Sequence, residues 1–128
     1  MHRGFIITAA VLGAIAVILG AFGAHWLKQM LPSESIATFE TGVRYQFYHV
    51  FALLATGFLF DKYPGKMTRY AGYAFIAGIL LFSGSLYLLT LFKATNTVGL
   101  TGLGILTPFG GLFFIAGWLF LGLAVRKK

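Results

Sequence analysis

Cysteine, acidic residues and charge in general are scarce in this chain of 128 residues. The absence of cysteine excludes disulfides, thiolate metal sites, cysteine nucleophiles and dithiol redox chemistry. Asp and Glu together number only three, and no Ser-His-Asp or paired-carboxylate arrangement occurs, so we do not expect an enzyme. Charged residues make up 10% of the chain, whereas an ordinary soluble domain carries about 25%.

Apolar residues take the place of the missing charge. They account for 59% of the chain, and the mean hydropathy is +0.86, which leaves too little polar surface to cover a soluble globule. We therefore expect a single transmembrane domain over residues 1–128. The net charge of +7 would suggest nucleic acid in a soluble chain. Here the basic residues flank apolar segments without interleaved aromatics, so we expect membrane lipids as partners and no nucleic acid.

The apolar segments predict an all-α fold, an integral membrane four-helix bundle. The predicted helices cover residues 4–27, 34–60, 68–92 and 107–125. Thr107 and Pro108 are typical of a helix start, with threonine as the N-cap and proline at the first helical position. The apolar part of the second helix, residues 50–60, is shorter than the roughly 20 residues that a span needs. The polar stretch before it must therefore enter the membrane as an amphipathic extension of that helix.

The distribution of basic residues predicts the orientation. With four helices, the two termini and the 61–69 turn lie on one side of the membrane, and that side holds seven of the ten basic residues. They are Arg3, Lys62, Lys66, Arg69, Arg126, Lys127 and Lys128. Because basic residues remain in the cytoplasm, we expect a multi-pass protein of the bacterial cytoplasmic (inner) membrane with both termini inside.

Small residues recur at helical spacing on three of the predicted helices. Such faces let helix backbones approach closely in lipid, so we predict that they pack against neighbouring helices. The residues concerned are Gly13, Gly20, Ala24, Gly78, Ser83, Ser85, Gly110 and Gly117.

Residues 37–49 form the one stretch in which charged, amide, phenol and imidazole groups crowd together. Glu40 and Arg44 are four residues apart with the acid first, the favourable order for an intrahelical pair. A guanidinium in hydrocarbon needs a partner, so a salt bridge between these two residues is the structural interpretation. Polar groups occur all round this helix, and we therefore predict that it is the enclosed one.

The polar cluster is also the candidate binding site for a small ligand, a lipid or a protein partner at the outer leaflet. Its candidate residues are Glu40, Arg44, Gln46, His49, His25, Tyr45 and Asn96. Structural roles compete with this interpretation: His49 hydrogen-bonded to Ser83 or Ser85, Asn96 pinning a loop, and Tyr45, Tyr48 and Tyr87 tying helices together. His49 lies about 13 Å along the helix from Glu40, and no His-x-x-x-His spacing occurs, so we expect no metal and no cofactor.

Four motifs carry a resemblance to a known family. They are Gly20-Ala-Phe-Gly-Ala-His25, Ala37-Thr-Phe-Glu-Thr-Gly-Val-Arg-Tyr-Gln-Phe-Tyr-His49, Phe82-Ser-Gly-Ser-Leu-Tyr87, and Thr107-Pro-Phe-Gly-Gly111 with Gly117-Trp118. The chain resembles the domain of unknown function 423 family over essentially its whole length. That family comprises small four-helix proteins of the bacterial inner membrane, with small eukaryotic transmembrane relatives. The resemblance implies a membrane location and four helices, and it implies no activity.

Three kinds of function remain open at this point. The first is a small membrane protein whose polar cluster is a structural centre and a candidate binding site. The second is an accessory or scaffolding subunit of a larger membrane complex, which would dock through the small-residue faces of the first and fourth helices. A homo-oligomer without another partner would argue against this second hypothesis. The third, a minimal transporter, would need a water-accessible path, for which four helices are few unless the protein oligomerises.

Overall fold

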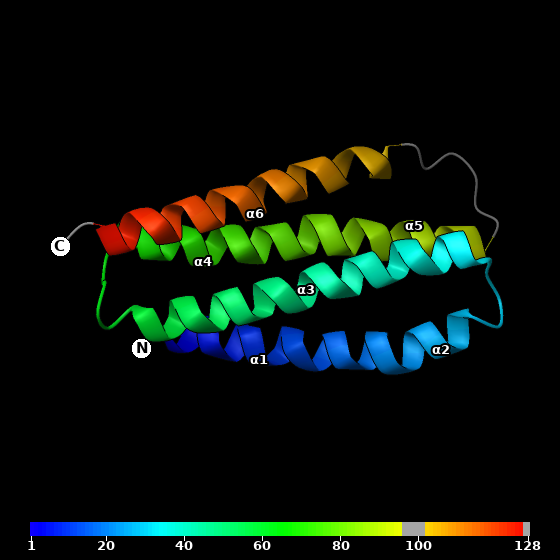
Figure 1. Ribbon diagram of the computed structural model, residues 1–128, viewed down its shortest axis with the longest axis horizontal. Helices are drawn as coiled ribbons and strands as arrows, with labels where there is room; N and C mark the ends of the chain where they lie inside the picture. The colour runs from blue at the N-terminus through cyan, green and yellow to red at the C-terminus, as the bar shows by residue number, and fades with distance from the viewer. Residues whose placement is uncertain (96–101, 127–128) are drawn as a thin grey trace.

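The computed structural model describes residues 1–95 and 102–126, which form four long antiparallel helices (Figure 1). The all-α membrane bundle that the composition predicts is confirmed. The first helix comprises α1 (Arg3–Ile18), η1 (Leu19–Gly23) and α2 (Ala24–Leu27), and the second is α3 (Ser33–Leu59). The third comprises α4 (Lys66–Gly78), η2 (Ile79–Ser83) and α5 (Gly84–Ala94), and the fourth is α6 (Leu103–Arg126).

The helices follow one another in space in the order of the chain (Figure 1). The first helix packs against α3, α3 packs against α4 and α5, and α6 packs against the third helix and reaches α3 through Phe114 and Trp118. The start of α1, the end of α6 and the turn between α3 and α4 lie at one end of the bundle, called the terminal end below. The turn between α2 and α3 lies at the opposite end, called the far end.

Three of the described helices are long and apolar enough to cross a membrane: Arg3–Leu27, Lys66–Ala94 and Leu103–Arg126. Their outer faces carry exposed large apolar side chains such as Ile7, Leu80 and Leu119, as expected for surfaces that face lipid. The polar helix α3 has 27 residues, or about 40 Å of helix, and runs alongside the other three (Figure 1). It therefore has the length to cross a membrane beside them.

The main core lies in the half of the bundle nearer the terminal end. Phe5, Leu53 and Phe75, from the first, second and third helices, are at most 2% exposed, and Phe114 of α6 packs with them. A smaller cluster in the far half joins Ala24 to Phe39 and Val43. Because lipid tails are as apolar as these side chains, close packing rather than the hydrophobic effect holds the helices together.

Glycines let the helices approach one another closely. A Cβ atom at Gly13 would lie 3.4 Å from Val50, and one at Gly20 would lie 3.2 Å from Val43, both on α3. On α6, Cβ atoms at Gly110 and Gly117 would lie 2.3 Å and 2.6 Å from atoms of the third helix. The small-residue faces of the first and fourth helices are therefore filled from within the chain. They cannot also be the docking surfaces that the accessory-subunit hypothesis assigned to them.

The start of the fourth helix differs from its prediction. α6 begins at Leu103, and Pro108 lies inside it, so Thr107 is not an N-cap. Proline at this position removes one hydrogen bond, to the carbonyl of Gly104, and a Cβ atom at Gly104 would have no heavy atom within 4 Å. The hydroxyl of Thr107 instead lies 2.6 Å from that of Ser85. A local capping rule could not foresee this contact between two helices.

Candidate functional site

The polar stretch 37–49 divides into a buried side and an exposed side. Gln46 and His49 are 2% and 4% exposed, whereas Glu40, Arg44 and Tyr48 are exposed. The prediction that this helix is enclosed on every side is therefore wrong. The first and third helices pack against α3, and α6 reaches it at His49, so the charged residues lie on the side that remains open.

Gln46 joins three helices from the centre of the bundle. Its Nε2 donates a hydrogen bond to the carbonyl of Leu12 in α1 at 2.7 Å. The hydroxyl of Tyr87 in α5 donates to its Oε1 at 2.6 Å. Both ends of the amide are thus satisfied by protein groups, which makes Gln46 a structural residue. Tyr87 ties two helices together, as predicted.

His49 connects α3 to α6. The indole N–H of Trp118 donates to Nε2 of His49 at 3.1 Å. An indole nitrogen can only donate, so Nε2 is an unprotonated acceptor. The proton then resides on Nδ1, which donates to the carbonyl of Tyr45 at 2.7 Å, and the imidazole is neutral. The predicted hydrogen bond to Ser83 or Ser85 is wrong, because the ring turns towards α6 and stacks on Phe114 with centroids 3.5 Å apart.

The two serines make other contacts between helices. Ser83 donates to the carbonyl of Gly42 in α3 at 2.6 Å, and Ser85 bonds Thr107 of α6. No buried side-chain nitrogen or oxygen in the described parts of the chain lacks a hydrogen-bond partner. The buried half of the polar cluster is therefore complete within the chain and offers no free group to a ligand.

Two π-helical segments lie on either side of α3 at the level of this cluster. η1 brings Gly20 and Gly23 against Val43 and Phe39, and η2 supplies the Ser83 hydroxyl that bonds Gly42. Such segments are frequent at functional sites. Sequence reasoning missed both of them, because the wider turns follow from packing and carry no signal in residue type.

The two tyrosines of α3, Tyr45 and Tyr48, make different contacts. The ring of Tyr45 lies 4.7 Å from that of Phe82 in η2, centroid to centroid, so it contributes to helix packing as predicted. Tyr48 is 54% exposed and its ring meets Tyr45 of the same helix. The prediction that Tyr48 ties helices together is wrong.

The exposed side of α3 forms a continuous line of residues, called the outer stripe. It consists of Ala37, Glu40, Arg44, Tyr48, Phe51, Ala55 and Phe58, all exposed. Across residues 1–95 and 102–126 the one ion pair joins the N-terminal ammonium to Asp61 at the terminal end. The predicted salt bridge between Glu40 and Arg44 is therefore wrong. No neighbouring helix encloses these two side chains, so nothing holds them in one geometry.

The depth of Arg44 follows from its neighbours. The preceding residue, Val43, packs against Gly20 of the first helix. That helix reaches the exposed Trp26 and Lys28, an aromatic ring and a base that mark a membrane interface. Lys28 lies eight residues beyond Gly20 in the sequence, or about 12 Å. Arg44 therefore leaves the bundle near the level of Gly20, inside the apolar stretch Arg3–Leu27, and charged side chains within such a span normally face a protein interior or a counter-charge.

The far end of the bundle has a cavity of about 360 Å³. Lys28 and Glu40 bring one charge of each sign to its lining, together with Leu31, Ser33, Ile36 and Ala37. His25 is exposed at the same end but does not line this cavity. The prediction for Asn96 falls outside the described residues.

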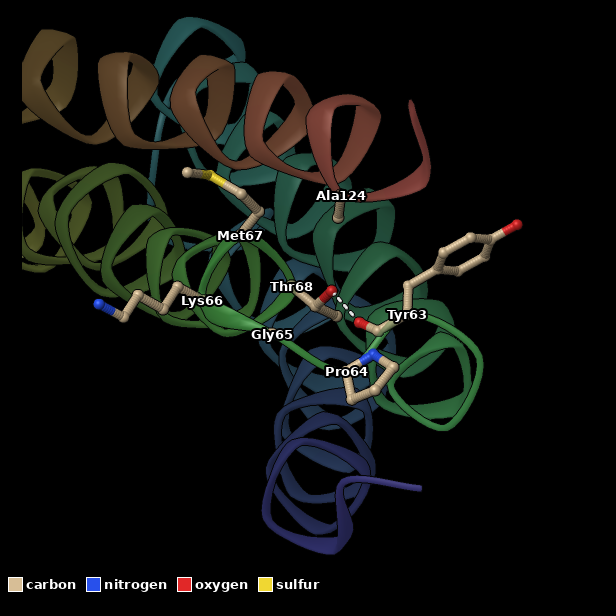
Figure 2. Close-up of a pocket in the computed structure, with 7 residues that line it drawn as sticks. All are labelled: Tyr63, Pro64, Gly65, Lys66, Met67, Thr68 and Ala124. Atoms are coloured by element: carbon tan, nitrogen blue, oxygen red, sulfur yellow. Dashed lines mark hydrogen bonds between the residues drawn. The ribbon is translucent and has the colours of Figure 1, made fainter. Parts of the chain in front are cut away.

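A second cavity, of about 290 Å³, lies at the terminal end. Figure 2 shows it between the turn at Pro64, the first residues of α4 and Ala124 of α6. The hydroxyl of Thr68 donates to the carbonyl of Tyr63 at its edge. Sequence reasoning identified the turn and did not foresee the cavity, because α6 contributes one wall from a distant part of the chain.

Comparison with known proteins identifies relatives of the whole chain. Residues 19–111 match a family described as protein of unknown function (DUF423). The chain is 41% identical to the UPF0382 membrane protein YwdK of Bacillus subtilis over 96% of each chain. It is 37% identical to a UPF0382 membrane protein of Haemophilus influenzae, over 100% of this chain and 98% of the relative. It is 36% identical to the UPF0382 inner membrane protein YgdD of Escherichia coli, over 98% and 92%. No solved structure matches.

Proposed function

We propose a function from the premise that this chain belongs to the DUF423 family of membrane proteins, whose relatives bear the name UPF0382. The chain is a multi-pass protein of the inner membrane, in keeping with its apolar helices and with the name of the Escherichia coli relative. Its role is non-catalytic. It is an interaction subunit that binds a helix of another membrane protein along the outer stripe of α3.

The observation that carries this proposal is the exposure of Glu40 and Arg44 on the open side of α3. A charged side chain near the centre of a membrane helix costs about 2.5–3.5 kcal/mol on insertion scales, and the cost falls towards the interface. Neither residue has a counter-ion within the described chain. A partner helix that carries a base opposite Glu40 and an acid opposite Arg44 would remove this cost for both. Tyr48 and Phe51 would add apolar contact area below the charges.

A small-ligand site is the alternative, and the cavity lined by Lys28 and Glu40 supports it. A ligand with one acidic and one basic group would suit those two side chains. We prefer the docking function because Arg44 is not among the residues that line that cavity. Ligand binding there would be lost in Lys28→Gln and kept in Arg44→Glu, the opposite of the pattern expected for docking.

The orientation belongs to the same proposal: both termini lie in the cytoplasm, which puts Arg44 in the outer leaflet. Supporting this, the basic residues gather at the terminal end, as cytoplasmic segments do. A cytoplasm-active reporter fused after Lys128 should work, and a periplasm-active one should be silent. The reverse pattern would overturn the orientation.

Docking along the outer stripe can be tested by site-directed cross-linking in native membranes. Because the chain contains no cysteine, Tyr48→Cys gives a single attachment point for a photoreactive maleimide. We expect one adduct of defined mass that Arg44→Glu abolishes through charge repulsion. Lys93→Glu makes the same charge change at an exposed site on α5 and should leave the adduct intact. Ile15→Cys, at a lipid-facing site on α1, should give no adduct.

The result of the cross-linking experiment identifies the kind of partner that binds the outer stripe. A heterologous adduct that depends on Arg44 supports the proposal. An adduct between two copies of the chain would replace it with a homo-oligomer, in which Glu40 of each copy meets Arg44 of the other across a two-fold axis. An adduct that survives Arg44→Glu, or no adduct at all, would mean that the charged stripe is not a docking surface.

A further inference from the structure

The seam between α4 and α6 carries a hollow surface on a different part of the molecule from the outer stripe. It is an apolar groove of about 580 Å³ that runs along the two helices and opens sideways. Four aromatic rings form its walls and alanines form its floor: Tyr70, Tyr73, Phe113 and Phe120 with Ala77 and Ala116. Tyr70 and Phe120 also meet across the seam, with ring centroids 5.7 Å apart.

The groove leads to a base at the terminal end. Lys66, Tyr70, Tyr73 and Ala77 follow one another at helical spacing and share one face of α4. Lys66 is exposed and lines the end cavity, where its ammonium points away from Tyr63 and Pro64 (Figure 2). Lys66 and Ala77 are separated by about 16 Å along the helix. One ligand can therefore reach both the base and the floor of the groove.

The terminal end of the bundle, where Lys66 lies, is positively charged. The described basic residues there are Arg3, Lys62, Lys66, Arg69 and Arg126, and the one acid, Asp61, is already paired with the N-terminal ammonium. Arg69 lies over the ring of Phe60, 5.5 Å from its centroid, and therefore turns towards the end of α3. Lys66 is therefore the basic residue that lies in line with the groove.

We propose that this seam binds a phospholipid with an anionic head group. One acyl chain lies in the aromatic groove, and the phosphate lies at the terminal end beside Lys66. The groove requires an apolar chain, and the unneutralised base at its mouth requires a negative charge at the end of that chain. A zwitterionic lipid has the same chain, but its own cation offsets the attraction to Lys66. The head-group charge should therefore decide the affinity.

The test uses the full chain in mild detergent and native mass spectrometry. Dioleoyl phosphatidylglycerol and dioleoyl phosphatidylcholine are titrated separately, so that only the head group differs. We expect the anionic lipid to bind several-fold more tightly. Lys66→Gln should weaken its binding about fivefold, the factor that one basic residue near a membrane surface typically supplies. Arg69→Gln is the matched control, since it removes the same charge one turn away, and it should change the affinity by less than twofold.

A separate variant tests whether the acyl chain lies in the groove. Ala116→Phe fills the floor of the groove and should abolish tight binding of both lipids. Ala14→Phe, the same change at an exposed site on α1, should not. Equal affinities for the two lipids, equal effects of Lys66→Gln and Arg69→Gln, or undiminished binding by Ala116→Phe would each overturn the proposal. So would a disulfide-linked dimer formed by Ala116→Cys in membranes, because the groove would then hold a second copy of the chain.

Discussion

Gly110→Ala should destabilise the bundle more than any other glycine-to-alanine substitution on α6. The new Cβ would lie 2.3 Å from the backbone nitrogen of Phe82 and 2.7 Å from its Cα. A side chain in that place could rotate away, but a backbone can yield only if α6 and the third helix separate along the seam. Overpacking of a filled core costs about 1–3 kcal/mol and occasionally more, and we expect the upper end of that range, about 3 kcal/mol.

The matched control lies on the same helix. Gly122 is exposed, and a Cβ there would have no heavy atom within 4 Å, so Gly122→Ala should be neutral or slightly stabilising, since alanine favours helix by up to about 1 kcal/mol over glycine. Thermal unfolding of both variants in the same detergent measures the difference. Equal midpoints would mean that α6 does not approach the third helix as closely as the structure has it.

Removing one partner of the Gln46–Tyr87 hydrogen bond should cost more than removing both. Tyr87→Phe leaves the Gln46 oxygen without the hydroxyl that donates to it, and Gln46→Met leaves that hydroxyl without its acceptor. An unsatisfied buried group costs about 1–3 kcal/mol, although measured hydrogen bonds between membrane helices average about 0.6 kcal/mol. We expect a loss of about 1–2 kcal/mol for each single variant.

The double variant distinguishes a real pair from two independent losses. Methionine has nearly the shape of glutamine, and phenylalanine keeps the ring of Tyr87 without its hydroxyl. Both sides of the contact then become apolar, so at least half of the summed loss should be recovered. Tyr48→Phe removes an exposed hydroxyl and should change the free energy of unfolding by less than about 0.5 kcal/mol. Strictly additive losses would contradict the hydrogen bond, and with it the role of Gln46 as the link between three helices.

The existence and type of the helices could be predicted from residue order alone. A backbone in lipid must satisfy its own hydrogen bonds, and a helix does so within one segment. The apolar run therefore predicts a helix over 4–27, and the first helix spans Arg3–Leu27. The fourth helix shows the limit of local rules, because Thr107 and Pro108 predict a start four residues later than the observed one.

The candidate site was predictable as a set of residues but not as an arrangement. Periodicity puts Glu40 and Arg44 on one side of a helix, and Gln46 and His49 on other sides. It does not say which side the neighbouring helices cover. The hydrogen-bond partners could not be predicted from the sequence either. Gln46 bonds a carbonyl 34 residues away, and His49 bonds an indole 69 residues away.

That the chain enters a membrane as helices follows from its amino-acid sequence, since composition and hydrogen-bond satisfaction are local properties of each segment. Which half of the polar stretch is buried depends instead on contacts between helices that are distant in the sequence. Gly20 admits Val43 on one side of α3 and Ser83 reaches Gly42 on another, and these two contacts turn Gln46 and His49 inward. Arg44 and Glu40 are left facing outward because none of the three neighbouring helices covers their side of α3.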